Sequence, residues 1–288
     1  MVLLSSLLSL VLAASPTPAP TPQPRIIQTE VDYVEGEGAD PVKHTLDIFQ
    51  PEGQQGLPVL LFFHGGVWQR GDKAAYTNVG QALARRGILT LVVNYRLTPA
   101  VQHPGHVQDA ARATAWAIEN AERFGGRKDR VFLSGHSAGG HLVTLLLFDS
   151  SYLKAVGHAP EELAGVIPLS GVFDLTRPID DTPEGGFEAF IFPPFGQDKA
   201  ARLAASPAAH LRAVRPPLLV LLAGEDYKDM RQQSRDFVTA LKARKLPVSF
   251  LTVPGRGHFE LVQQIGSDKD PTTEHLVRFI SGKPPDTR

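Results

Sequence analysis

The segment over residues 135–139 has the pattern G-x-S-x-G, with Ser137 at its centre. A serine hydroxyl is a weak nucleophile at neutral pH and needs a base, a group that orients the base, and donors for the oxyanion that forms. The short apolar run 131–133 precedes the segment, and the apolar, helix-like run 138–148 follows it. This strand–turn–helix context predicts that Ser137 is a nucleophile projected at a helix N-terminus. The alternative is an ordinary tight Gly-Ser turn.

Glycines also follow the apolar run 57–63, in the segment that begins at His64. Small residues there let backbone N–H groups approach a substrate carbonyl, together with the N–H of the residue after the nucleophile. The predicted oxyanion hole is therefore formed by the N–H groups of Gly66, Val67 and Ala138. A glycine turn with no such role is the alternative. We expect His64 to brace this loop rather than to act as the base.

The base and the acid are expected after the last strands. His258 follows the predicted strand 248–253, whereas the other late histidine, His275, falls inside a predicted helix. His258 is therefore the predicted base. The loop after the apolar run 218–222 offers three carboxylates, and Asp226 is the best placed of them, with Glu225 and Asp229 as alternatives. The resulting chain order Ser, Asp, His is one of the known orders of a serine triad.

Apolar runs that alternate with helical patterns are expected to position these residues. Alternation of this kind predicts an α/β fold, a mostly parallel sheet with helices on both faces. The predicted strands cover residues 43–49, 57–63, 88–93, 131–133, 165–169, 218–222 and 248–253. The predicted helices cover residues 78–86, 107–124, 138–148, 234–244 and 272–280.

Residues 173–206 interrupt this rhythm with Asp180-Asp181, Gly185-Gly186 and Pro193-Pro194, and they carry several phenylalanines. Apolar side chains on an exposed loop are costly, so a small cap over a pocket is favoured over a loose surface excursion. Trp68, Phe190 and Phe192 are predicted to wall the substrate pocket, with simple core packing as the alternative.

The N-terminal segment bears on cellular location. Residues 1–14 form an apolar run of signal-peptide length, which is too short to anchor the chain in a bilayer, although no Lys or Arg precedes it. A Pro/Thr-rich tether over residues 15–25 follows, and the catalytic domain covers residues 26–288. We therefore predict a secreted or periplasmic protein without a stable membrane anchor once the leader is removed. A mis-started or disordered N-terminus is the alternative.

Composition removes several classes of partner and site. A formal net charge of −1 gives no general attraction to nucleic acid, so no nucleic-acid partner is predicted. The absence of cysteine excludes disulfides, thiolate metal sites and a cysteine nucleophile. His103 and His106 have no third ligand nearby in the sequence, so no metal site is predicted.

Several segments together resemble the carboxylesterase branch of the α/β-hydrolases, over roughly residues 31–280. The similarity is closest to BD-FAE-like (feruloyl-esterase-like), kynurenine-formamidase-like and isoprenylcysteine-methylesterase-like members. It is carried by His64-Gly65-Gly66-Val67-Trp68-Gln69-Arg70-Gly71-Asp72-Lys73, Asn94-Tyr95-Arg96-Leu97 and Gly135-His136-Ser137-Ala138-Gly139-Gly140-His141-Leu142, and extended by Ser170-Gly171-Val172-Phe173-Asp174-Leu175 and Arg231-Gln232-Gln233-Ser234. Two departures from the related patterns are Val67 in place of a third glycine and an acid loop one residue shorter than G-x-x-D.

The resemblance implies hydrolysis of a small-molecule ester through a covalent acyl-enzyme, with no cofactor. Ser137, Asp226 and His258 would form the triad. The expected activity is that of a serine carboxylesterase on small or short-chain esters. An arylformamidase that cleaves an N-formyl amide is the second hypothesis, and a non-catalytic binding module on the same scaffold is the third.

Overall fold

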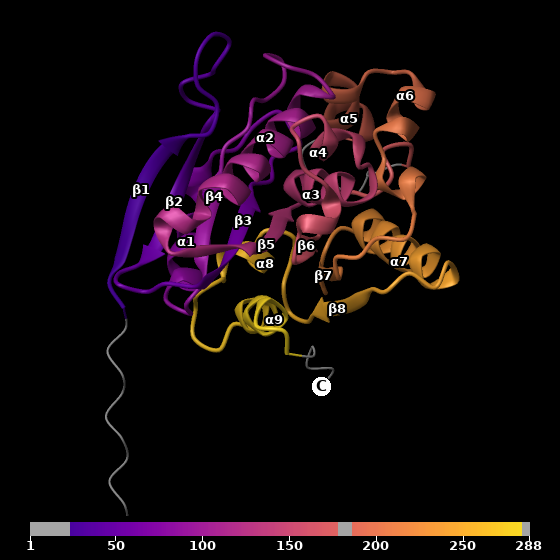
Figure 1. The fold of residues 1–288 in the computed structure, drawn as a ribbon. Coiled ribbons are helices and arrows are strands. Elements are labelled where there is room, and N and C mark those ends of the chain that lie inside the picture. The colour runs from indigo at the N-terminus through magenta and orange to yellow at the C-terminus, as the bar shows by residue number, and fades with distance from the viewer. Residues whose placement is uncertain (1–23, 178–185, 284–288) are drawn as a thin grey trace, which may run out of the picture.

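The computed structural model describes residues 24–177 and 186–283. The predicted signal peptide, nearly all of the predicted tether and residues 178–185 of the predicted cap lie outside the described residues. Within the described residues the chain folds around an eight-stranded sheet of order β1-β2-β4-β3-β5-β6-β7-β8 (Figure 1). The strands are β1 (Ile26–Asp32), β2 (Thr45–Pro51), β3 (Leu57–Phe63), β4 (Leu89–Val93), β5 (Gly126–His136), β6 (Gly165–Leu169), β7 (Leu219–Ala223) and β8 (Ser249–Val253).

The sheet is mostly parallel, as predicted. β1 pairs antiparallel with β2 and β2 antiparallel with β4, while the pairs from β4 through β3 to β8 are all parallel. The central strands β3, β6 and β7 are apolar throughout, and β4 is apolar except for the buried Thr90, because both faces of a parallel sheet are covered.

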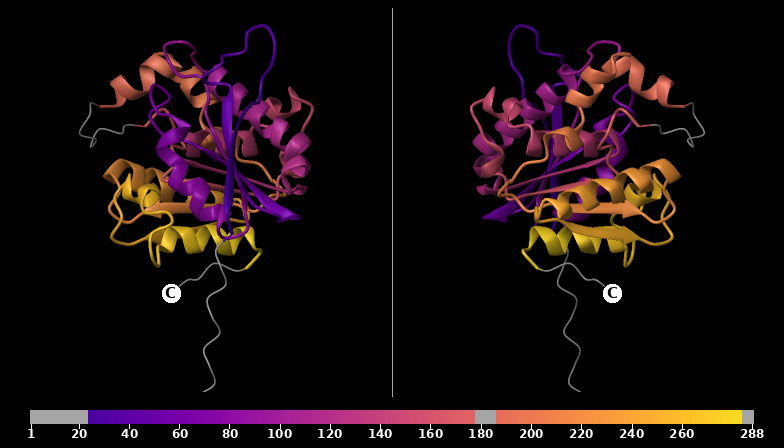
Figure 2. Two further views of the ribbon diagram at one scale, coloured as in Figure 1. Left: turned by 90° about the vertical axis from the view of Figure 1, so that its left-hand side faces the viewer. Right: turned by 90° about the vertical axis from the view of Figure 1, so that its right-hand side faces the viewer.

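Helices cover both faces of the twisted sheet (Figure 2). Alternate residues of β3 show the two layers: Leu61 and Phe63 share a core with α2, α3 and α7, whereas Leu60 and Phe62 share one with α1 and α9. The α-helices are α1 (Thr77–Ala84), α2 (Gly105–Asn120), α3 (Ala138–Phe148), α4 (Ser151–Lys154), α5 (Phe187–Phe195), α6 (Lys199–Ala204), α7 (Lys228–Ala243), α8 (Glu260–Gln263) and α9 (Pro271–Ile280). Short 3₁₀ turns are η1 (Lys73–Tyr76), η2 (Ala121–Phe124), η3 (Pro160–Glu162) and η4 (Pro207–His210).

Three of the differences from the sequence prediction have a clear physical reason. β1 was not predicted, because it is a largely exposed edge strand without an apolar face. β5 begins at Gly126, ahead of the apolar residues 131–133, since Gly126 already pairs with Leu57 of β3. The charged residues 127–130 lie at an irregularity between this pair and the next one, Val131 with Val59. α7 begins at Lys228 rather than at residue 234, because its buried stripe starts at Met230 and includes the polar Gln233.

In its described residues, the interrupted segment contains the helices α5 and α6, which lie together at the upper right of Figure 1. Two prolines, Pro193 and Pro194, lie inside α5 and cannot donate the backbone hydrogen bonds that would reach Ala189 and Phe190. The side chain of Gln69 donates to those two carbonyls instead, at 3.1 and 3.2 Å. The loop after β3 therefore helps to hold α5 in place.

Candidate active site

Ser137 lies between the end of β5 and the first residue of α3. Its backbone has φ 55° and ψ −114°, a left-handed conformation that non-glycine residues rarely adopt and that is often found at functional sites. The flanking glycines allow this turn. A Cβ atom on Gly139 would lie 2.1 Å from the carbonyl oxygen of Phe63, and one on Gly135 would lie 2.5 Å from the Gly139 carbonyl carbon. The pattern G-x-S-x-G is therefore a packing requirement of this turn.

His258 and Asp226 meet at the ends of β8 and β7. His258 Nδ1 lies 2.8 Å from Asp226 Oδ1, and the same oxygen accepts the N–H of Tyr227 at 2.8 Å. Because a carboxylate only accepts hydrogen bonds, Nδ1 of a neutral His258 carries the proton and Nε2 presents a lone pair. This is the protonation state that a general base requires.

Of the three carboxylates considered from the sequence, Asp226 is the one that bonds to His258 in the described structure. Asp226 is 4% exposed, so its negative charge is held in a poorly solvated position. Glu225 is exposed, and its backbone N–H donates to the carbonyl of Arg256. Asp229 belongs to the first turn of α7.

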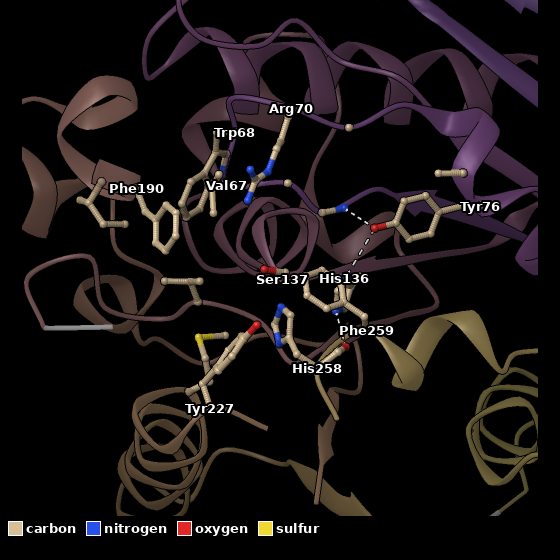
Figure 3. A pocket seen from close by; sticks show the side chains of 17 residues that line it. Val67, Trp68, Arg70, Tyr76, His136, Ser137, Phe190, Tyr227, His258 and Phe259 are labelled. Carbon is tan, nitrogen blue, oxygen red and sulfur yellow. Dashed lines mark hydrogen bonds between the residues drawn. The ribbon is translucent and has the colours of Figure 1, made fainter. Parts of the chain in front are cut away.

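Ser137 and His258 line one pocket, and their side chains face each other across it (Figure 3). No direct hydrogen bond joins these two described residues. Serine–histidine contacts of this kind are often long without substrate and tighten when substrate binds. The geometry allows His258 Nε2 to take a proton from the Ser137 hydroxyl.

The loop after β3 also borders the pocket. Gly66, Val67 and Trp68 have positive φ angles of 121°, 51° and 58°, and the turn is closed by the N–H groups of Gln69 and Arg70, which donate to the Gly66 carbonyl. The N–H groups of Gly66 and Val67 meet no acceptor among the described residues. That of Ala138, in the first turn of α3, has no partner within its helix. These are the three donors that the sequence analysis singled out for an oxyanion.

The pocket has a volume of about 320 Å³ and is mainly apolar. Trp68 and Phe190, both buried, line it. Phe192 does not line it: Cζ of Arg202 lies 5.0 Å from the centre of its ring. Residues two apart on a helix do not share a face, so Phe190 and Phe192 of α5 point in different directions. Both phenylalanines were predicted to line the pocket because the sequence did not reveal that they lie on one helix.

Other lining residues were not identified from the sequence. They come from η1, the loop after β6, α5, the start of α7 and the loop before α8, and they include Tyr76, Val172, Ile191, Tyr227, Met230 and Phe259. The sequence assigns none of them a chemical role. Their place in one pocket depends on the strand order of the sheet, which local patterns do not reveal.

Three further histidines, His64, His103 and His106, are kept neutral by burial. His64 is buried, stacks on Tyr95 at 4.4 Å between ring centres, and holds its Nδ1 2.7 Å from the Gly65 carbonyl oxygen. Burial lowers the pKa of His64 to about 4, and burial does the same for His103 and His106. Within residues 24–177 and 186–283, no cluster of three or more potential metal ligands occurs.

A family model and several known proteins are similar to this chain in sequence. The BD-FAE family model matches residues 46–241. An isoprenylcysteine alpha-carbonyl methylesterase of Arabidopsis thaliana is 26% identical over 84% of this chain and 60% of its own length. The esterase LipC of Mycobacterium tuberculosis is 30% identical over 85% of this chain and 63% of its own length. This chain therefore spans about 60% of the length of these two relatives.

Two further matches bear on the fold and on the alternatives. The kynurenine formamidase of Danio rerio is 26% identical over 87% of this chain and 81% of its own length. The crystal structure of esterase B from Lactobacillus rhamnosis superposes with a TM-score of 0.75 and 21% identity, covering 89% of this chain and 85% of that one. This likeness confirms the predicted α/β-hydrolase fold.

Proposed function

This chain belongs to the BD-FAE family, and we propose that it is a serine carboxylesterase that hydrolyses small or short-chain carboxylic esters. The observation that carries the proposal is the 2.8 Å contact between His258 Nδ1 and Asp226 Oδ1, opposite Ser137 in a single pocket. The esterase LipC, a relative, supports the reaction class.

Acylation begins when His258 Nε2 takes the Ser137 proton and Oγ attacks the ester carbonyl carbon. The carbonyl oxygen becomes an oxyanion that the N–H groups of Gly66, Val67 and Ala138 stabilise. Asp226 stabilises the imidazolium that forms. His258 then gives its proton to the alcohol oxygen as the ester C–O bond breaks, which leaves an acyl group on Ser137.

Deacylation repeats these steps with water. His258 removes a proton from a water molecule that attacks the acyl carbon, and it returns the proton to Ser137 Oγ as the acid leaves. The pocket of about 320 Å³ is at the small end of the usual range for ligand sites. Its size, and the wall formed by Trp68 and Phe190, support short rather than long acyl groups.

A panel of p-nitrophenyl esters graded from acetate to decanoate tests the proposal. We expect the highest kcat/KM for the short esters and a loss of at least 10³-fold in the Ser137→Ala variant. Full activity in that variant would refute the nucleophile. A preference for decanoate would refute the short-chain assignment. Failure of a fluorophosphonate probe to label Ser137 in the wild-type protein would favour a non-catalytic binding module.

Hydrolysis of an N-formyl amide is a second candidate function. This chain aligns with 81% of the length of the kynurenine formamidase, against 60% and 63% of the lengths of the two esterases. The same triad can attack an N-formyl group. Rates on N-formylkynurenine and p-nitrophenyl acetate, measured on one enzyme preparation, separate the two. A higher kcat/KM for the formamide would replace the esterase assignment.

We also propose that the protein is secreted or periplasmic, on the basis of residues 1–14, which lie outside the described structure. None of the helices in the described parts of the chain is long and apolar enough to cross a membrane. Residues 1–25 fused to a reporter that is active only outside the cytoplasm provide the test. Reporter activity confined to the cytoplasm would contradict the proposal.

A further inference from the structure

A chain of hydrogen bonds connects three loops that meet behind Ser137 (Figure 3). The N–H of Gly65 donates to the Tyr76 hydroxyl oxygen at 3.1 Å, and the Tyr76 hydroxyl lies 3.4 Å from His136 Nδ1. His136 Nε2 lies 2.9 Å from the carbonyl oxygen of His258. Tyr76 and His136 therefore join the oxyanion loop, the nucleophile turn and the loop of the base.

Only one arrangement of protons satisfies this chain. A carbonyl oxygen only accepts, so His136 Nε2 must carry the proton that points to His258. In a neutral ring Nδ1 is then a lone pair, and it accepts the hydroxyl proton of Tyr76. The Tyr76 oxygen remains free to accept the Gly65 N–H. Burial lowers the pKa of His136 well below its usual value, in keeping with a neutral ring.

The backbone of Gly65 has little room to move while these hydrogen bonds are intact. A Cβ atom on Gly65 would lie 2.9 Å from His136 Nδ1 and 3.3 Å from the Ser137 Cβ, so the loop touches the nucleophile turn on one side. The hydrogen bond to Tyr76 holds its N–H on the other. Gly66 and Val67 follow directly, so a shift of Gly65 moves the two donors proposed for the oxyanion.

We propose that Tyr76 and His136 are positioning residues that fix the oxyanion donors and His258 relative to Ser137. The inference rests on the esterase function proposed above. Neither side chain needs to contact the reacting atoms. Their contribution is geometric, since a misplacement of about 1 Å in a catalytic site can cost about 10²-fold in rate.

The test isolates the hydroxyl. The Tyr76 ring packs against Phe62, with 5.4 Å between ring centres, so Tyr76→Phe keeps the packing and removes the hydrogen bonds. We expect kcat for p-nitrophenyl acetate to fall about tenfold, equivalent to about 1.4 kcal/mol, with KM changed less than twofold. Tyr152→Phe is the matched control, because its hydroxyl also lies on a histidine nitrogen, 3.2 Å from His103 Nε2, but away from this pocket. It should leave kcat unchanged.

A double-mutant cycle tests whether the two residues act as one unit. His136→Leu should lower kcat by at least as much as Tyr76→Phe, and the double variant should be no worse than His136→Leu alone. His136→Gln, which keeps a donor and an acceptor, should recover part of the loss. Melting temperatures report whether each variant folds, and if His136→Leu does not, the cycle is run with His136→Ala, which also removes the donor and the acceptor. Unchanged kcat in folded Tyr76→Phe, or strictly additive losses, would overturn the proposal.

Nitrogen NMR of the histidine rings provides a readout that does not depend on hydrolysis. The wild-type protein should show His136 protonated on Nε2 with Nδ1 accepting a hydrogen bond. Tyr76→Phe should keep the proton on Nε2, because the His258 carbonyl still accepts it, and should shift the Nδ1 resonance as that hydrogen bond is lost. A wild-type His136 with its proton on Nδ1 would refute the chain of hydrogen bonds. A wild-type protein that shows the Nε2 form but hydrolyses no ester would instead refute the proposed function.

Discussion

The carboxylate of Asp226 offers a direct test of the proposed triad. It is 4% exposed and accepts hydrogen bonds from His258 Nδ1 and from the Tyr227 N–H, both at 2.8 Å. Asp226→Asn removes the negative charge and keeps the shape of the side chain. The fold should therefore persist while the chemistry changes.

The size of the effect follows from the charge on His258 during the reaction. When His258 takes the Ser137 proton, its positive charge lies beside the Asp226 carboxylate, and two unit charges about 4 Å apart interact by about 4 kcal/mol at an effective dielectric of about 20. Losing that interaction lowers kcat by about 10³-fold. An asparagine that donates its N–H to Nδ1 would also hold the imidazole proton on Nε2, and the loss then reaches about 10⁴-fold.

The assay is kcat and KM on p-nitrophenyl acetate, with melting temperatures to verify folding. Glu225→Gln is the matched control, since it removes the adjacent, exposed carboxylate. It should stay within twofold of the wild type. More than a tenth of wild-type kcat in Asp226→Asn, or an equal loss in Glu225→Gln, would refute the assignment of the acid.

Three other outcomes follow from the structure. Gly139→Ala should destabilise the fold by about 3 kcal/mol in urea unfolding, because its Cβ would lie 2.1 Å from a carbonyl oxygen of β3; unchanged stability would contradict the packing argument. Phe190→Ala should raise kcat/KM for p-nitrophenyl octanoate relative to acetate about tenfold, whereas an equal rise in Phe192→Ala would show that the pocket wall is misassigned. The free energy of unfolding should fall as the pH drops from about 6.5 to about 4, because three buried histidines become protonated in the unfolded chain before they do so in the folded one. Each histidine whose pKa is lowered to about 4 contributes a loss of up to about 3 kcal/mol. Urea unfolding at pH 7, 5.5 and 4.5 measures the change, and a flat profile would refute it. These histidines are His64, His103 and His106.

The residues predicted for the triad share a local signal, and this is why the sequence could identify them. Ser137, Asp226 and His258 each follow the carboxyl end of a strand that contains a short apolar run, β5, β7 and β8 respectively. Parallel strands bring those ends to one edge of the sheet, so the fold class predicts their proximity. The pocket walls have no such signal. Tyr76 and Phe259 lie far apart in the chain, and their meeting depends on the order in which strands pair.

The helices and strands likewise fall into those that a side-chain pattern predicts and those that it does not. The strand over residues 57–63 was predicted with its exact bounds, because its buried faces require a continuous apolar run. β1 has mostly exposed side chains and is held by its backbone pairing with β2, so its side-chain pattern does not predict a strand. Helix α7 was predicted too short at its start because Gln233, although polar, is buried on its inner face.

Helix α5 shows why the predicted cap could not be read as helical from its own residues. Two adjacent prolines normally end a helix, since each removes a backbone donor and leaves a carbonyl without its partner. Here the carbonyls of Ala189 and Phe190 are satisfied by Gln69, a side chain 120 and 121 residues away in the sequence. The helix is therefore stabilised by the loop that carries the proposed oxyanion donors, and that loop is in turn held against the helix that walls the pocket. The same two hydrogen bonds therefore stabilise helix α5 and position the loop that carries Gln69. Because they join residues far apart in the sequence, the local sequence of α5 does not reveal the helix.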